Sequence, residues 1–214
     1  MIHEEMMQSR RAFLASAGKI ALGAAVAATV APVANVVADE TPAAPTHPFT
    51  YVKLDPEEVL KRGYQGYYDL NGCCAGAFDA IIGSLADKVG YPFNQIPNQM
   101  FANGATGYGS GSLCGALGGC NAAIALLLAK DDARKVTAEL HAWYMDHQFP
   151  EYDPENYAAK KTVAKSVNCA DSVSKFMKEN NIGMKDPIRK ARCGAVTGEC
   201  ARKTVELLNA HFNL

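Results

Sequence analysis

The sequence predicts an all-α protein: a single compact, bundle-like, multi-helix domain behind an N-terminal signal segment. Three observations lead to this fold class. Residues that cap helices recur along the chain, apolar residues repeat at helical spacing, and no segment alternates β-branched and polar residues as a half-buried strand does. The chain has 214 residues, which is enough for one domain with a sizeable core and hardly enough for two.

Three Asp-Pro pairs predict where helices begin. Asp55-Pro56, Asp153-Pro154 and Asp186-Pro187 each place a carboxylate at the cap and a proline at the first helical position. The missing N–H of proline is harmless there, because the first N–H groups of a helix have no partner inside the helix. We therefore expect helices to start at all three pairs, the last of them running over about 187–210.

Apolar spacing predicts two buried helices. Leucine, isoleucine, phenylalanine and cysteine recur every three or four residues between Cys74 and Val89, and again between Leu113 and Leu128. Further helices are expected over about 132–147 and 169–180. The stretch 91–112 is rich in glycine, proline and asparagine, so we expect a loop that closes on the start of the next helix.

Residues 1–38 are predicted to be a twin-arginine signal peptide. Ser9-Arg10-Arg11-Ala12-Phe13-Leu14 is followed by a weakly apolar run, and Val36-Val37-Ala38 offers small residues for cleavage. A flexible linker over 39–48 and a helical, cysteine-containing redox domain over 49–214 would follow. We expect a periplasmic or otherwise exported protein that meets a membrane only through this segment, if the segment is not cleaved. Because the twin-arginine route carries folded proteins, the leader favours a bound cofactor.

Composition argues against two classes of function. The net charge is −1, and no Lys/Arg cluster with interleaved aromatic residues occurs outside the leader, so we expect no nucleic-acid partner. No carboxylate pair and no Ser/His/Asp arrangement stands out, and the acidic residues at helix starts are explained as caps. An electron carrier needs no substrate-processing residues, so their absence is compatible with such a function, which we expect rather than substrate conversion without deciding between the two.

The chemistry is expected at cysteines. There are seven, an odd number, so disulfide pairing alone leaves at least one thiol over. The sequence contains no Cys-x-x-Cys pair, which argues against a thioredoxin-type dithiol or a zinc ribbon, and no Cys-x-x-Cys-His, which argues against covalent haem c. Any site must be assembled from distant segments, and His141, His147 and His211 are interpreted as surface or core residues rather than ligands.

Two cysteines lie on helix faces made of small residues. Cys73 shares a face with Gly76, Ala77, Ala80 and Ser84, and Cys114 shares one with Gly118, Asn121, Ala122, Ala125 and Ala129. Small faces let helix backbones approach closely, so we expect these two helices to meet there and to bring both sulfurs together. Cys114 also opens its helix, where free N–H groups stabilise a thiolate.

The other cysteines are harder to assign from their positions. Cys74 and Cys120 lie on bulky apolar stripes, where a thiol behaves as a small hydrophobic group. Cys169 begins a predicted helix, and Cys193 and Cys200 share one face of the last helix with Val196. Cys74, Cys120 and Cys200 are kept as reserve candidates for metal ligands.

Gly72-Cys73-Cys74-Ala75-Gly76-Ala77-Phe78 and Cys114-Gly115-Ala116-Leu117-Gly118-Gly119 resemble a redox-active family, C_GCAxxG_C_C, which is named for its Cys-Gly-Ala-x-x-Gly motif and four recurring cysteines. The resemblance covers about residues 60–210, including Trp143-Tyr144 and Arg192-Cys193. It looks closest to an exported branch related to split-Soret cytochrome c.

This resemblance implies that Cys73, Cys114, Cys169 and Cys193 are the four family cysteines and that they bind a cofactor. It also implies an iron–sulfur centre beside haem groups, but this chain lacks haem-attachment motifs and has Ala170 where the exported branch tends to have a histidine. The expected function is therefore periplasmic electron transfer through an iron–sulfur cluster, [2Fe–2S], held by these four cysteines. The redox partner is not identified.

Two alternatives stay open. The same cysteines could carry thiol–disulfide chemistry or hold zinc, and the chain could also be a structural domain with buried thiols. A homodimer is a further expectation, with the Tyr64, Tyr67 and Tyr68 cluster and the small helix faces as candidate contacts.

Overall fold

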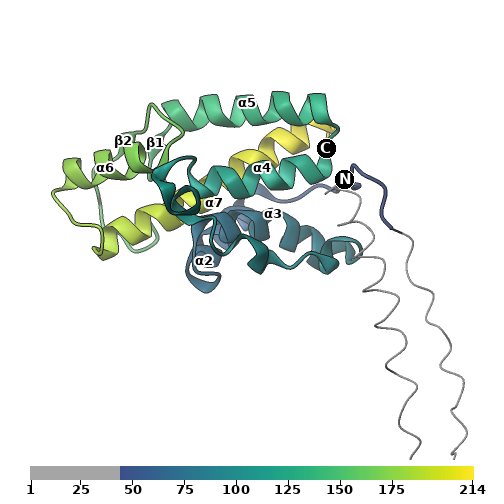
Figure 1. The fold of residues 1–214 in the computed structure, drawn as a ribbon, viewed down its shortest axis with the longest axis horizontal. Helices are drawn as coiled ribbons and strands as arrows, with labels where there is room; N and C mark the ends of the chain where they lie inside the picture. Colours follow the sequence, from purple (N-terminus) through teal and green to yellow (C-terminus); the bar gives the residue numbers. More distant parts are fainter. Residues whose placement is uncertain (1–43) are drawn as a thin grey trace, which may run out of the picture. The chain divides into compact units, whose positions relative to one another are not determined.

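Six α-helices make up most of residues 44–214, the part of the chain that this computed structural model describes (Figure 1). The all-α prediction is confirmed. The predicted signal peptide and the predicted linker up to residue 43 lie outside the described residues. The helices are α2 (Pro56–Asp69), α3 (Cys73–Val89), α4 (Gly115–Leu127), α5 (Lys130–Asp146), α6 (Cys169–Asn180) and α7 (Pro187–His211).

Two of the three predicted helix starts are confirmed. The Asp55 carboxylate accepts hydrogen bonds from the backbone N–H of Glu57 and of Glu58 at 2.8 and 3.1 Å, and α2 begins at Pro56. The Asp186 carboxylate accepts one from the Ile188 N–H at 2.8 Å, and α7 begins at Pro187. Both caps satisfy backbone donors that the helix itself leaves free.

The helix predicted at Asp153 is wrong. Residues 151–160 contain no helix, and the Asp153 carboxylate instead accepts the backbone N–H groups of Tyr157 and Ala158 at 3.1 and 2.9 Å, which closes a turn. Asn156 and Ala158 have φ values of 56° and 51° there, which no α-helix allows. The capping signal is local, and no apolar stripe follows it that could hold a helix against the core.

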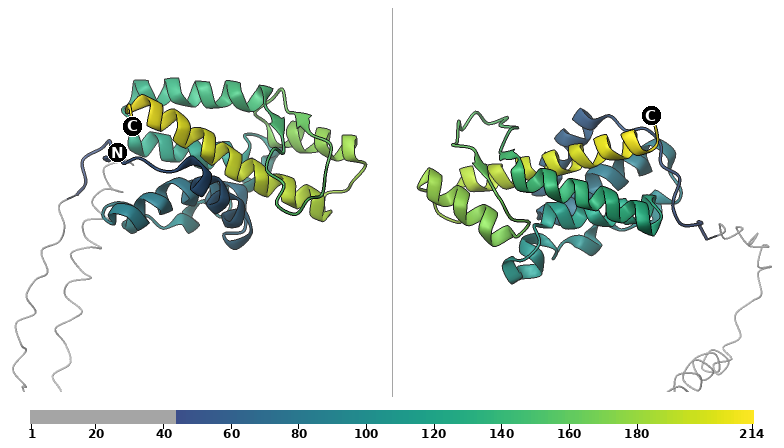
Figure 2. Two further views of the ribbon diagram at one scale, coloured as in Figure 1. Left: turned by 180° about the vertical axis from the view of Figure 1, so that it is seen from behind. Right: turned by 90° about the horizontal axis from the view of Figure 1, so that it is seen from above.

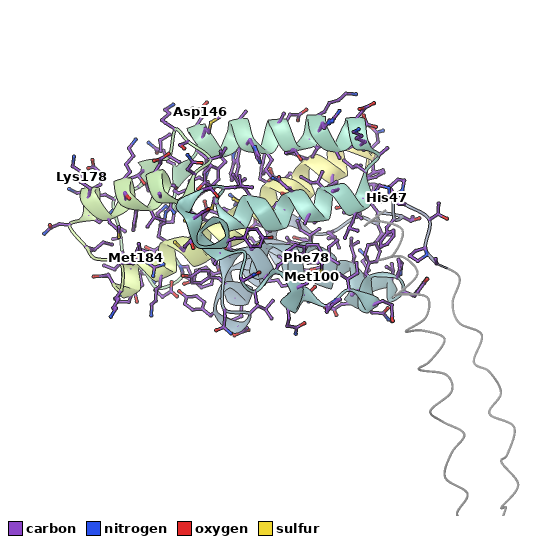
Figure 3. The ribbon with its side chains drawn as sticks, viewed as in Figure 1. His47, Phe78, Met100, Asp146, Lys178 and Met184 are labelled. Carbon is purple, nitrogen blue, oxygen red and sulfur yellow. The ribbon has the colours of Figure 1, made fainter. Side chains whose placement is uncertain are left out.

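The long helix α7 lies between the α4–α5 side and the α2–α3 side of the bundle and contacts all four of these helices (Figures 1 and 2). Its closest approach is to α2, where Gly63 faces Gly198. A Cβ atom on Gly63 would lie 2.8 Å from the Gly198 Cα atom, so the two backbones are almost in contact. Phe78, labelled in Figure 3, is among the side chains buried in this bundle.

The predicted meeting of α3 and α4 is confirmed, and the predicted contact faces are correct in part, since Cys73 and Ala77 of α3 do face α4. The contact is made by Gly115 and Gly119 of α4 rather than by its Gly118 face, whose Ala125 and Ala129 are exposed. On α3, Gly76 packs against Gly66 of α2 instead of α4. The reason is that α3 packs against both α2 and α4, so the residues of its small face are divided between these two neighbours.

Short elements fill the connections. The predicted loop 91–112 contains the helical turns η2 (Phe93–Gln95) and η3 (Asn98–Phe101) and the segment η4 (Gly107–Gly111), in which Tyr108 and Gly109 have positive φ values. After α5, the strands β1 (Gln148–Phe149) and β2 (Thr162–Val163) pair antiparallel. Within residues 44–214, no helix has both the length and the apolar content that crossing a membrane requires.

Candidate functional site

Three of the four family cysteines line one cavity of about 560 Å³, and the fourth, Cys114, is buried next to them. This volume lies in the usual range for cofactor and ligand sites. Met184, labelled in Figure 3 at the α6–α7 end of the bundle, is one of the lining residues. The cavity is also lined by Tyr67, Tyr68, Thr106, Ala170, Arg189 and the cysteines Cys73, Cys169 and Cys193.

Each family cysteine lies at or near the first turns of its helix. Cys73 is the first residue of α3, Cys114 caps α4, Cys169 is the first residue of α6, and Cys193 lies in the second turn of α7. The four cysteines therefore come from four different helices, as the sequence analysis expects.

A short β-bridge places Cys114 beside Cys169. Leu113 and Asn168 pair antiparallel, the Cys114 N–H donates to the Val167 carbonyl at 2.8 Å, and the Cys169 N–H donates to the Ser112 carbonyl at 2.6 Å. These reciprocal bonds hold the starts of α4 and α6 together. This bridge was not predicted from the sequence, because it joins segments more than fifty residues apart.

Cys73 is held against the start of α4. A Cβ atom on Gly115 would overlap the Cys73 sulfur, so only glycine leaves room for the thiol at this point. The backbone N–H of Thr106 also interacts with the Cys73 sulfur from the glycine-rich loop. Packing therefore explains the Cys-Gly pair of the motif: Cys114 supplies one sulfur, and Gly115 leaves space for the sulfur of Cys73.

The four thiols share one electrostatic environment. Burial raises the pKa of Cys73, and the nearby sulfurs of Cys114, Cys193 and Cys169 raise it further. Burial also raises the pKa of Cys169 to about 12, with further contributions from Cys114 and Cys193. Gathering thiolates in a desolvated cavity is unfavourable by itself, and a bound cation that displaces the thiol protons removes this penalty.

Two arginines of α7 lie next to Cys193. The Arg189 Nη1 atom is 3.8 Å from the Cys193 sulfur and donates to the Tyr67 hydroxyl at 3.3 Å. Arg192, one residue before Cys193, is buried. Neither side chain was predicted as part of the site, although Arg192-Cys193 belongs to the family resemblance. Arg189, four residues before Cys193, lies on the same face of α7, whereas helical spacing does not predict that Arg192 lies close to the sulfur.

The three reserve cysteines lie in the core. Cys74, Cys120 and Cys200 are buried, as the apolar stripes predict for the first two. Burial raises the pKa of Cys74 to about 11 and that of Cys120 to about 12. Cys74 is packed against the glycine-rich loop, since a Cβ atom on Gly104 would lie 2.6 Å from its sulfur. None of the three lines the cavity.

All seven cysteines are free thiols. Across residues 44–214, no three Cys, His, Asp or Glu side chains converge in the present rotamers as a ready-made metal site. Three of the family cysteines line the cavity instead, and Cys114 is buried beside them. His141 is bonded to Asn121 at 3.0 Å and His147 lies 3.4 Å from Glu199, so both lie outside the cavity lining.

Residues 73–207 match the family described as "Putative redox-active protein (C_GCAxxG_C_C)". The chain belongs to this family. The match starts at Cys73 and includes Cys114, Cys169 and Cys193, so all four cysteines around the cavity fall inside it.

This member of the C_GCAxxG_C_C family is similar in sequence and in structure to a known cytochrome. It is 34% identical over 169 residues to split-Soret cytochrome c of Desulfovibrio desulfuricans, an alignment that covers 75% of this chain and 61% of that protein. The chain thus matches less than two thirds of its relative's length. A solved structure of the same cytochrome, described as having a novel iron centre, superposes with a TM-score of 0.73 at 33% identity, covering 77% of this chain and 72% of that one.

Proposed function

We propose that this protein transfers electrons through an iron centre bound in the cavity by Cys73, Cys114, Cys169 and Cys193. The observation that carries the proposal is that Cys73, Cys169 and Cys193, from three helices, line one cavity, with Cys114 of a fourth helix buried beside them. The relation to a cytochrome with a novel iron centre supports iron as the metal.

The residues present fit an iron–sulfur cluster, [2Fe–2S], better than a hard cation. Four thiols are the usual ligand complement of such clusters, and soft sulfur ligands favour iron–sulfur chemistry. No Asp or Glu is among the described residues that line the cavity, so a calcium or magnesium site lacks its oxygen ligands. When bound, the cluster supplies one-electron exchange.

The protein's own side chains would hold the centre and control access to it. Cys114 and Cys169 are buried, whereas Cys73 and Cys193 are partly exposed at the cavity. Tyr68 and Met184 on the same lining are 40% and 57% exposed. An electron partner that docks at this side of the cavity would come close to the cluster without any opening of the fold.

The test is the metal content of anaerobically purified protein. We expect about two iron and two acid-labile sulfide per chain, with visible absorption bands, as four cysteines imply for [2Fe–2S]. Cys114→Ser should lose the iron and the bands, whereas Cys120→Ser, which changes a buried thiol outside the cavity, should keep both. Colourless protein without iron, or equal loss in both variants, would contradict the proposal.

Thiol–disulfide chemistry or zinc binding is the second candidate. Cys73 and Cys193 are partly exposed on the same cavity and interact electrostatically, so they are placed to exchange with an external disulfide. Protein that is iron-free but contains one zinc per chain, or that gains a Cys73–Cys193 disulfide on mild oxidation, would support this candidate.

We also propose export by the twin-arginine route. The proposal rests on Arg10-Arg11 and the apolar run that follows them. In a bacterial host with this pathway, the full chain should reach the periplasm in a shorter, cleaved form, and Arg10→Lys with Arg11→Lys should leave it uncleaved in the cytoplasm. Equal export of both chains would refute the assignment.

A further inference from the structure

Behind the cavity, a chain of buried polar side chains connects two of the four cysteines. We propose that Arg192, Ser172 and Tyr144 act as positioning residues that set the charge and the reduction potential of the cysteine site. This inference rests on the proposed function for its redox part.

Arg192 is an unusual residue to bury. It is 2% exposed, yet within residues 44–214 no carboxylate forms an ion pair with it. Its Nη2 atom donates to the Ser172 hydroxyl at 2.5 Å, and its Nε atom has no hydrogen-bond partner. The rings of Phe149 and Phe176 lie 5.8 and 5.6 Å from the guanidinium carbon, within the range of cation–π attraction, but they carry no net charge that could balance it.

A buried arginine needs a negative charge nearby, because an unpaired ion in a desolvated interior is strongly destabilising. The groups that face this guanidinium are Ser172, Tyr144, Cys193 and Cys114. The guanidinium also interacts with Cys193, Tyr144 and Cys114. Ser172 is neutral and Tyr144 is a buried phenol, so the cysteine sulfurs are the groups suited to carry the compensating charge.

Tyr144 completes the connection. It is fully buried, its hydroxyl donates to the Ser172 hydroxyl at 3.1 Å, and it also interacts with the Cys114 sulfur. The order of contacts is therefore Cys114, Tyr144, Ser172, Arg192 and Cys193. These contacts fix the positions of the Cys114 and Cys193 sulfurs and place the positive charge of Arg192 beside them.

The consequence for redox chemistry follows from charge. Reduction adds a negative charge to a site that already carries thiolates, and a fixed cation beside it stabilises the reduced form more than the oxidised form. Arg192 should therefore raise the reduction potential. Arg189 also lies near Cys193, but it is partly exposed on the cavity, so solvent and salt weaken its effect.

The test uses iron-loaded, full-length protein and the variants Arg192→Met, Arg192→Lys and Tyr144→Phe. The matched control is Arg202→Met, which removes a cation from the same helix that is already paired with Glu151 at the surface. The readouts are iron content, visible and EPR spectra, circular dichroism and the midpoint potential.

We expect Arg192→Met to favour the oxidised form at least tenfold at any fixed potential, which is a shift of about 59 mV to lower potential for one electron. Arg192→Lys should restore most of this shift, Tyr144→Phe should alter the spectrum with a smaller shift in the same direction, and Arg202→Met should behave as the original chain. A midpoint unchanged in both Arg192→Met and Tyr144→Phe, at full iron content, would overturn the inference.

A second readout keeps the inference separate from the proposed function. In iron-free, reduced protein, Arg192→Met and Tyr144→Phe remove two members of one hydrogen-bonded network, so their effects on the free energy of unfolding should not add, whereas those of Arg202→Met and Tyr144→Phe should add. Non-additive effects without any iron binding would support the network and refute the iron centre. Additive effects of Arg192→Met and Tyr144→Phe would refute the network whether or not iron binds.

Discussion

The contact between α3 and α4 gives a sharp prediction about two neighbouring glycines. A Cβ atom on Gly119 would lie 2.9 Å from the Phe78 backbone nitrogen and closer still to the Cys74 carbonyl oxygen. Both atoms belong to the backbone of α3 and cannot turn aside. A Cβ atom on Gly118 would meet only the Cys74 sulfur at 3.5 Å, which is an ordinary contact.

These distances set the expected magnitudes. Gly119→Ala must push α3 and α4 apart by roughly 1 Å, and overpacking of this kind costs about 3 kcal/mol when neither side can relax. Replacing a helical glycine by alanine returns about 1 kcal/mol, so the net loss is about 2 kcal/mol, or a fall in Tm of roughly 4–8 °C. Gly118→Ala should keep the gain of about 1 kcal/mol, since it meets no backbone.

The assay is urea and thermal unfolding of iron-free, reduced protein, so that cofactor binding does not contribute to the stability. The two variants should differ by about 3 kcal/mol in the free energy of unfolding and should move in opposite directions. If Gly119→Ala is as stable as Gly118→Ala, the close approach of α3 and α4 is wrong, and with it the placement of Cys73 against α4.

Three further predictions concern caps, alkaline pH and thiol access. Asp186→Ala should lower the free energy of unfolding by about 1 kcal/mol with some loss of helical circular dichroism, whereas Asp153→Ala should leave the helical signal unchanged, because Asp153 caps a turn; equal helix loss in both would contradict this. The pKa values of Cys120 and Cys169 are raised to about 12 in the folded chain, so these thiols ionise near pH 9 only after unfolding. The free energy of unfolding should therefore be constant below about pH 8.5 and should fall at higher pH by up to about 1.4 kcal/mol per pH unit for each thiol. Urea midpoints from pH 7 to 10 check this, and Cys120→Ala should flatten the slope; stability that is independent of pH would refute it. In native iron-free protein, iodoacetamide should label Cys193 and Cys73 before Cys120 and Cys200, as peptide mass spectrometry can follow; early labelling of Cys200 would show that the core is open.

Local signals predicted the helices well where a cap and an apolar stripe agree. Asp55 and Asp186 each precede such a stripe, and α6 spans Cys169–Asn180 as expected over 169–180. Asp153 has the same cap without the stripe, and the chain forms a turn. A cap satisfies backbone donors but supplies no burial, so it marks the start of a helix only where packing stabilises that helix.

The site was predicted in part for a related reason. Spacing along one helix indicates which residues share a face, but not which neighbour covers that face. Gly76 therefore looked like a contact for α4 and proved to face α2. The bridge between Leu113 and Asn168, which brings Cys114 beside Cys169, leaves no local mark on the sequence, since a single pair of residues has no period.

The positions of the sulfurs suggest how the fold tolerates a cluster of thiolates. Cys73, Cys114 and Cys169 each stand at the start of a helix, where unpaired N–H groups and the helix dipole favour negative charge, and Cys193 has two arginines beside it. No described carboxylate lines the cavity to compete with the sulfurs for this positive field. Burial nevertheless dominates in the metal-free chain and raises the pKa of Cys73 and Cys169, which keeps these thiols protonated. The helix starts and arginines thus reduce the cost of ionisation without removing it. The cation of the proposed iron centre would supply the remainder, so that metal binding and proton release should occur together.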